Sequence, residues 1–135
     1  MRTKFWRFAY EDSELAATLK SDELPFPELS KWPSAKNSSC EQIIEDLKFG
    51  DFILLANFDR LSEIGIVKAI GQVAAKKDTK IIMYWKKLIP SLSLTPDIRG
   101  GVNVWSTEGV FCFDEQPAKR YKLHAHTKKL FGNSA

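Results

Sequence analysis

Residues 47–73, LKFGDFILLANFDRLSEIGIVKAIGQV, decide the fold of this chain because two apolar runs flank a short polar segment. The first run, residues 52–56, is too short for a typical helix and is rich in strand-forming residues, so it predicts a buried strand. Residues 57–60 have turn chemistry, and the second run, residues 64–73, predicts the returning strand of a hairpin.

Glycines interrupt the second of these strands. Gly65 and Gly71 each remove a side chain from a strand position, which is typical of a bulge or of a close backbone approach. An isolated hairpin is only marginally stable in water, so other parts of the chain must pair with it and cover it.

Several other segments have the periodicity of regular structure. Residues 4–10 alternate as a strand does, which predicts that Phe5 and Trp6 face opposite sides. Residues 13–20, with Ser13 as N-cap, and residues 39–48 predict short amphipathic helices. Residues 79–94 predict another strand, which Pro90 restricts to an edge or a bend, and residues 102–105 and 109–113 are candidates for a further pair.

Length and composition predict a single domain over residues 1–135. The chain has 135 residues, 44% of them hydrophobic and 12% aromatic, which is close to the commonest domain size. No apolar run approaches the roughly 20 residues that span a bilayer, and the N-terminal residues lack the apolar core of a signal peptide. We therefore expect a cytoplasmic protein with no membrane partner. Without export, Cys40 and Cys112 are expected to be free thiols, and His124 and His126 complete no metal-ligand spacing, so no metal or cofactor is expected.

Charge is distributed unevenly along the chain. Residues 1–68 carry 9 Lys and Arg against 12 Asp and Glu, net −3, whereas residues 69–135 carry 11 against 5, net +6, which together make the +3 of the chain. The basic residues cluster at 76–87 and at 119–129. Such runs are most often solvated surface, but basic clusters beside aromatic residues such as Tyr84, Trp85 and Tyr121 are also what a nucleic-acid surface requires.

One order of motifs resembles a known family. Trp32 and Asn37 form a W-x4-N motif, and Gly50-Asp51 begins eighteen residues after Trp32, ahead of the apolar strand, the turn and the glycine-containing strand. With the aromatic strand at residues 5–8, this order resembles the EVE domain of the PUA-like superfamily, which includes the YTH readers of methylated adenine in RNA. The C-terminal stretch is similar to EVE-like modules of bacterial and archaeal modification-dependent restriction systems.

The resemblance implies an α+β fold in which a curved mixed sheet closes towards a barrel and short helices flank it. It also implies a pocket that receives a flipped-out base, with aromatic stacking, polar groups at the base edge and a basic rim. Trp32 would form a wall of that pocket, and the amide of Asn37 would donate to and accept from the base edge. Tyr10 replaces the small hydroxyl residue common in the family and Ala9 replaces a common lysine, which weakens the carry-over of the family's usual ligand because a larger phenol would narrow or reshape the pocket.

Each of these residues also has a structural interpretation. Trp32 fits a core plug, and Asn37 fits the N-cap of the helix that follows. Strand parity leaves open whether Tyr84 or Trp85 faces the pocket. The aromatic ring of Phe58 in a polar turn points to a lid or a partner contact. The candidate base-binding residues are Tyr10, Trp32, Ser34, Asn37, Phe58 and Trp85, and the candidate phosphate-binding residues are Lys36, Lys86, Lys87, Lys119 and Arg120.

The predicted function is non-enzymatic recognition of nucleic acid, DNA or RNA, at a modified and in particular methylated base. The chain would act alone or as the targeting subunit of a restriction or defence system. The alternatives are a protein-interaction module and a small PUA-like hydrolase. No Gly-rich phosphate loop, nucleophile elbow or metal-ligand cluster occurs, so no catalytic residue is predicted.

Overall fold

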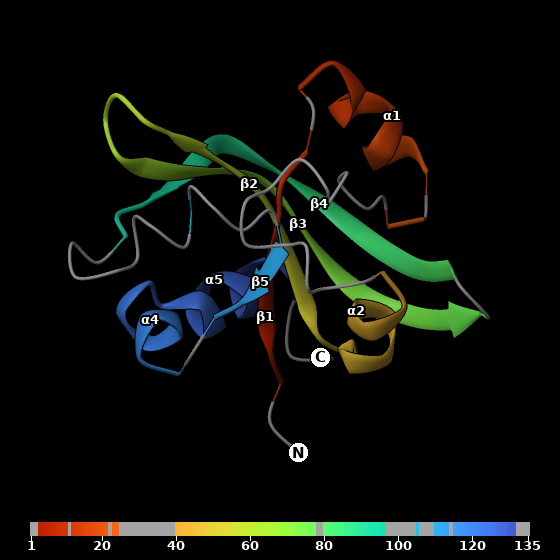
Figure 1. The fold of residues 1–135 in the computed structure, drawn as a ribbon. Coiled ribbons are helices and arrows are strands. Elements are labelled where there is room, and N and C mark those ends of the chain that lie inside the picture. The colour runs from red at the N-terminus through yellow and green to blue at the C-terminus, as the bar shows by residue number, and fades with distance from the viewer. Residues whose placement is uncertain are drawn as a thin grey trace.

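A curved sheet of five strands, in the order β4-β3-β2-β1-β5, organises the protein (Figure 1). The computed structural model describes residues 3–10, 12–21, 23–24, 40–77, 80–96, 105, 110–113 and 115–131. The predicted site residues Trp32, Ser34, Lys36 and Asn37 lie outside these residues. The strands are β1 (Phe5–Phe8), β2 (Phe52–Asp59), β3 (Ile64–Lys77), β4 (Lys80–Leu94) and β5 (Val110–Cys112).

The sheet is mixed. β1 runs parallel to β2, whereas the β1–β5, β2–β3 and β3–β4 pairs are antiparallel. The predicted α+β class is confirmed at this level. The described strands leave the sheet open, with β4 and β5 as its two edges, because β5 pairs only with β1 and β4 only with β3 among the strands.

The predicted hairpin is confirmed, but its turn lies later than expected. β2 remains paired with β3 as far as Asp59, opposite Ile64. The Asp59 carboxylate accepts hydrogen bonds from the Leu61 N–H and the Ser62 hydroxyl, and Glu63 adopts a φ of 55°. Residues 57–59 therefore belong to the strand, and the turn comprises residues 60–63.

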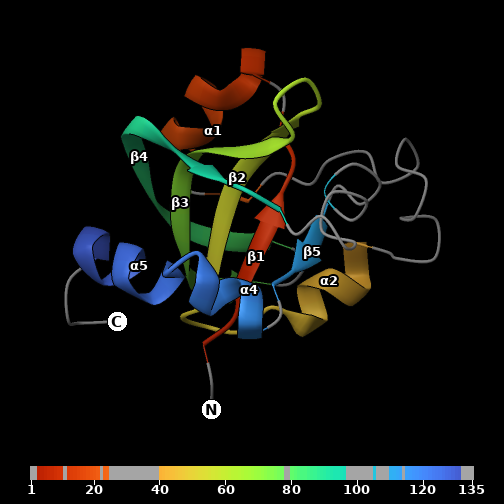
Figure 2. The same cartoon turned by 90° about the vertical axis from the view of Figure 1, so that its left-hand side faces the viewer.

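Side chains of the sheet alternate between two apolar clusters, one on each face. Phe5 belongs to the first cluster and Trp6 to the second, so the predicted opposition of these two residues is confirmed. The first cluster is covered by α4 (Glu115–Arg120) and α5 (Leu123–Phe131), which lie in front of the sheet in Figure 2. We call this side the α5 face.

The opposite side, which we call the α2 face, is covered by α1 (Leu15–Lys20) and α2 (Cys40–Asp46). A short 3-10 helix, η1 (Asp12–Glu14), precedes α1, so Ser13 lies within η1 and the predicted Ser13 cap is wrong. The N-cap position is occupied by Glu14, whose side chain makes no capping hydrogen bond. The second predicted helix is confirmed, and after it the buried carboxylate of Asp51 accepts the backbone N–H groups of Lys4 and Lys48 at 3.1 and 3.0 Å.

The C-terminal strand pairs differently from the prediction. β5 pairs with β1, and Trp105 has helical backbone geometry, so Trp105 forms no strand with residues 109–113. Residues 102–104 lie outside the described part of the chain. β2 pairs with only one edge of β1. The backbone groups on the other edge of β1 are therefore available to pair with β5.

Neither predicted glycine site is a bulge. The register of the sheet shifts at Leu55/Ala56, Val67/Ala69 and Val73/Ala75 instead. A Cβ on Gly65 would lie 2.4 Å from ring atoms of Trp105, and one on Gly71 would lie 2.4 Å from the Trp85 ring. The close approach predicted at these glycines is thus made by indole rings and not by backbone.

The edge position predicted for the Pro90 strand is confirmed. Val67 pairs with Leu92 and Ala69 with Lys87, so residues 88–91 of β4 lie opposite Lys68 alone. Pro90, which has no N–H to donate, lies within this bulge at the edge of the sheet.

Candidate nucleic-acid interface

The middle of β4 sends aromatic and basic side chains to both faces of the sheet. The Tyr84 side chain is 54% exposed and meets the Phe131 ring on the α5 face, with centroids 5.8 Å apart. The Nζ atom of Lys86 lies 4.9 Å from the Tyr84 ring centroid, so Lys86 shares this face. Tyr84 is therefore the ring that β4 presents to solvent.

Trp85 takes the opposite direction. Its ring lies over Gly71 and packs against the cluster on the α2 face. Lys87 is exposed and pairs across the sheet with Ala69, a member of the same cluster, which places Lys87 on the α2 face as well. The four residues 84–87 thus place one aromatic ring and one lysine on each side.

Two indole groups on the α2 face have unused hydrogen-bond donors. The Nε1 atoms of Trp6 and Trp85 are buried and have no acceptor among the described residues. The register puts both in one row, in which Trp6 is opposite Ile53, Ile53 opposite Gly71, and Gly71 opposite Trp85. A buried donor without a partner costs about 1 to 3 kcal/mol, so this row is unfavourable as it stands.

Tyr10 lies on the same face, partly buried against the same cluster. Its backbone is held at two points, because its N–H donates to Asn57 Oδ1 at 3.2 Å and its carbonyl accepts from Asn57 Nδ2 at 2.9 Å. The Asn57 side chain thus links the two segments two residues beyond the last β1–β2 pair, Phe8 and Leu55. Sequence reasoning assigned Asn57 to a turn and missed this role.

Phe58 is not near Tyr10 and Trp85. Its ring packs against the cluster on the α5 face, 6.4 Å from the Trp105 ring centroid, and it is partly buried there. The sheet separates Phe58 from the other two predicted base-binding residues. The described residues therefore do not bring all three into one pocket.

The helical pair α4–α5 carries a concentrated positive charge. Residues 115–131 contain five Lys and Arg and one Glu, net +4, so the remainder of the chain sums to −1. All five basic side chains are exposed. We call them the basic helical surface, which consists of Lys119, Arg120, Lys122, Lys128 and Lys129.

A second tyrosine stands at the start of α5. The Arg120 guanidinium carbon lies 5.0 Å from the Tyr121 ring centroid, and the Tyr121 hydroxyl donates to the Thr95 carbonyl at 2.8 Å. Lys119 pairs with Glu115 at 3.5 Å, although both side chains are more than half exposed. The structure thus places the predicted phosphate-binding residues Lys86, Lys119 and Arg120 on the α5 face or on the helices that cover it, and Lys86 and Arg120 each lie against a tyrosine ring.

Arg7 is a buried cation that sequence reasoning did not single out. Its Nε donates to the Ala56 carbonyl at 2.8 Å and its Nη1 to the Trp105 carbonyl at 3.3 Å. The guanidinium lies 5.0 Å from the Trp105 ring centroid, and burial lowers the pKa of Arg7 from its ordinary value to about 10. Strand alternation places Arg7 on the same side of the sheet as Phe5, and this pattern was the sequence signal from which its burial could have been predicted.

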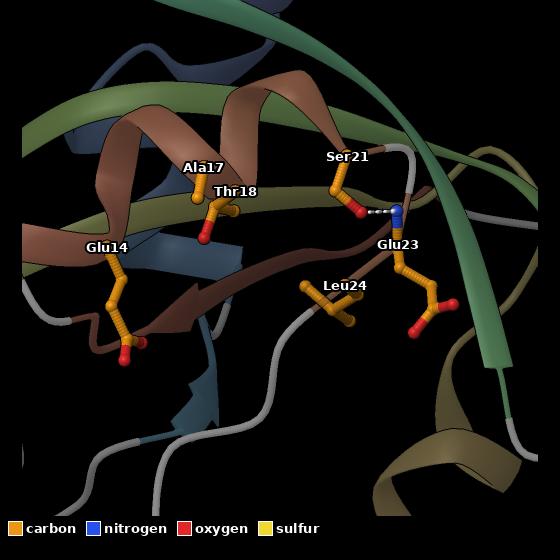
Figure 3. Close-up of a pocket in the computed structure, with 6 residues that line it drawn as sticks. All are labelled: Glu14, Ala17, Thr18, Ser21, Glu23 and Leu24. Atoms are coloured by element: carbon orange, nitrogen blue, oxygen red, sulfur yellow. Dashed lines mark hydrogen bonds between the residues drawn. The ribbon is translucent and has the colours of Figure 1, made fainter.

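A separate pocket of about 370 Å³ lies beneath α1 (Figure 3). Ala17 and Leu24 line it with four polar residues, Glu14, Thr18, Ser21 and Glu23. Ser21 Oγ accepts the Glu23 N–H, and the Glu23 carboxylate pairs with Lys80 at 3.4 Å. Because the described residues that line this pocket are acidic in balance and include no aromatic ring, they suit neither a phosphate nor a stacked base.

Metal-ligand clusters and membrane-spanning helices were both sought within the described ranges. No group of three or more His, Cys, Asp or Glu side chains in them is arranged to hold a metal ion. None of the helices found there has the length and apolar character needed to cross a bilayer. No protein-family model matches the sequence, and a search of curated proteins finds none similar to it, so the resemblance to the EVE domain rests on the residues alone.

Proposed function

We propose that this chain is a non-enzymatic nucleic-acid-binding module that holds phosphates on the basic helical surface and Lys86. The observation that carries the proposal is the concentration of net +4 on one exposed helical pair, beside two tyrosines that each have a cation against the ring. Clustered basic residues beside aromatic rings form the electrostatic and stacking surface that nucleic acids require.

Recognition of a modified base is the finer part of the proposal, and we assign it to the α2 face. Tyr10 and Trp85 pack there, Lys87 is exposed beside them, and the indole N–H groups of Trp6 and Trp85 lack acceptors among the described residues. A base carries ring nitrogens and carbonyl oxygens that accept such donors. The module would act on DNA or RNA, alone or as the targeting part of a restriction or defence assembly.

The exposed apolar residues favour nucleic acid over a protein partner. The large hydrophobic side chains most exposed among the described residues include Phe49 at 78% and Leu61 at 98%. Phe49 precedes the start of β2 and Leu61 follows its end, so they lie at opposite ends of the strand and form no common patch. A protein-docking surface requires a contiguous apolar area.

The test is the salt dependence of oligonucleotide binding for the double variant Lys128→Gln/Lys129→Gln. Each phosphate contact releases about 0.7 to 0.9 of a counterion, so loss of both lysines should reduce the log–log slope by about 1.4 to 1.8. Affinity is measured by fluorescence anisotropy at several salt concentrations. Oligonucleotides with and without methylated cytosine or adenine, compared in the same assay, test the modified-base assignment.

The matched control is Lys20→Gln/Lys48→Gln, which removes the same charge from exposed positions in and after the helices of the α2 face. This control should leave the slope unchanged. Equal loss in the two double variants would mean that only net charge matters, and absence of binding at low salt would reject the proposed function.

A further inference from the structure

Tyr84 is placed as a stacking platform at the rim of the α5 face. It lies on an edge strand, is 54% exposed, and meets Phe131 in a T-shaped contact with an interplanar angle of 74°. Its hydroxyl makes no hydrogen bond to the described residues. The ring is therefore held by Phe131 at its side and by Lys86 over its face, while much of its surface faces solvent.

Two lysines of α5 lie within one helical turn of Phe131, and Lys128 at i−3 shares its side of the helix whereas Lys129 at i−2 does not. Lys128 and Lys129 occupy the last turn of α5, three and two residues before Phe131. At about 1.5 Å of rise per residue, they lie about 3 to 5 Å along the helix axis from the residue that touches Tyr84. Lys86 adds a third cation from β4, with its Nζ 4.9 Å from the ring centroid.

The same arrangement recurs at the other end of α5. Tyr121 precedes this helix and has the Arg120 guanidinium 5.0 Å from its ring centroid. The nine residues of α5, about 13 Å long at helical rise, run from just after Tyr121 to Phe131, which contacts Tyr84. The basic helical surface thus connects two rings, each of which has its own cation.

We infer that this surface takes single-stranded nucleic acid in preference to duplex, with a base stacked on Tyr84 and the adjoining phosphates on Lys86, Lys128 and Lys129. This inference rests on the proposed function. Bases of a duplex are stacked on one another inside the helix and do not reach an external ring, whereas phosphates reach exposed lysines from either form. Stacking on Tyr84 therefore adds affinity for single-stranded nucleic acid, whose bases are not stacked inside a duplex.

The experiment compares a mixed-sequence single strand of about 16 nucleotides with its own duplex, by anisotropy at low salt. Tyr84→Ala should weaken binding of the single strand by about 5- to 150-fold, the range for loss of one stacking contact, and leave duplex binding within about twofold. Tyr84→Phe should retain single-strand affinity, because the ring persists. Lys128→Gln/Lys129→Gln should weaken both forms.

Thermal midpoints of all variants show whether the fold persists, and Tyr84 is exposed enough that Tyr84→Ala should fold. Tighter binding of duplex, or equal loss of both forms in Tyr84→Ala, would overturn the inference while the proposed function stands. Failure to bind either form would reject both. If phosphatidylserine vesicles displaced the single strand and bound the protein only when Tyr84 was present, the surface would be a membrane site and the inference would be wrong.

Discussion

Gly65 lies beneath the indole ring of Trp105, and no larger residue fits there. A Cβ at this position would come within 2.4 Å of two ring carbons and 2.9 Å of a third. Gly65→Ala should therefore destabilise the protein by about 1 to 3 kcal/mol, the usual cost of overpacking a filled core. The free energy of unfolding in urea measures the effect.

A double-mutant cycle tests whether the Trp105 ring causes the loss of stability in Gly65→Ala. In a Trp105→Leu background the alanine methyl meets no indole, so Gly65→Ala should cost much less than in the native protein. Additive free energies in the cycle would show that the penalty arises from the backbone and not from Trp105.

At the scale of the secondary-structure elements, β1 is a short strand, and we expect its place in the sheet to depend on the hydrogen bonds that Arg7 donates. Arg7 ties β1 to the β2 bulge through the Ala56 carbonyl and to Trp105 through a second carbonyl. These carbonyls would lose their donors in Arg7→Met, which we expect to destabilise the protein by about 1 to 3 kcal/mol.

The pH dependence of that loss follows from the direction of the pKa shift. Burial lowers the pKa of Arg7 from its ordinary value to about 10, so the unfolded chain binds more protons than the folded protein only between the folded and the unfolded pKa. Stability gained by this shift is complete above the unfolded pKa and is lost as pH falls through the folded pKa. The difference in unfolding free energy between native protein and Arg7→Met should therefore stay constant from about pH 6 to about pH 9. A difference that changed across the neutral range would contradict this account.

β4 is an edge strand with exposed backbone groups, and it also has features that oppose association with another chain. Its outer edge has backbone groups available for pairing, which in many proteins invites association with another chain. Lysines at 80, 86 and 87 and the bulge around Pro90 oppose such pairing, and the Glu23–Ile82 bridge covers one end. The element can thus hold Tyr84 at the rim without becoming an aggregation site.

At the scale of the whole molecule, both core clusters depend on the same strands. β2 contributes Leu54 to the cluster on the α5 face and Leu55 to the cluster on the α2 face. Loss of either covering layer exposes strands that the other layer needs. We therefore expect one cooperative unfolding transition, with urea curves from tryptophan fluorescence and far-UV circular dichroism that coincide.

Substitutions on either face sharpen this expectation. Ile43→Val on the α2 face and Ile70→Val on the α5 face should each shift both curves together, by about 0.5 to 1.5 kcal/mol. Two separate transitions, or a shift seen by one probe only, would mean that the faces unfold independently.

By itself, the sequence determined the elements whose signals are local. The apolar runs around residues 57–63 predicted the hairpin, the spacing in residues 39–48 predicted α2, and the paired glycines marked places where something approaches the strand. Pro90 predicted the edge strand, because a residue without N–H is excluded from a central ladder. For the candidate interface, the sequence showed the basic residues at 119–129 as a cluster of charge but did not show their arrangement on two helices.

Only the tertiary structure decided which residues meet across the sheet. It placed Tyr84 outward and Trp85 inward, separated Phe58 from Tyr10, paired β5 with β1 and buried Arg7. The physical reason is sequence separation: Asn57 holds Tyr10 from 47 positions away, and Arg7 reaches Ala56 and Trp105 across 49 and 98. Local periodicity carries no information about such contacts, because they exist only after the strands have paired and the helices have covered them.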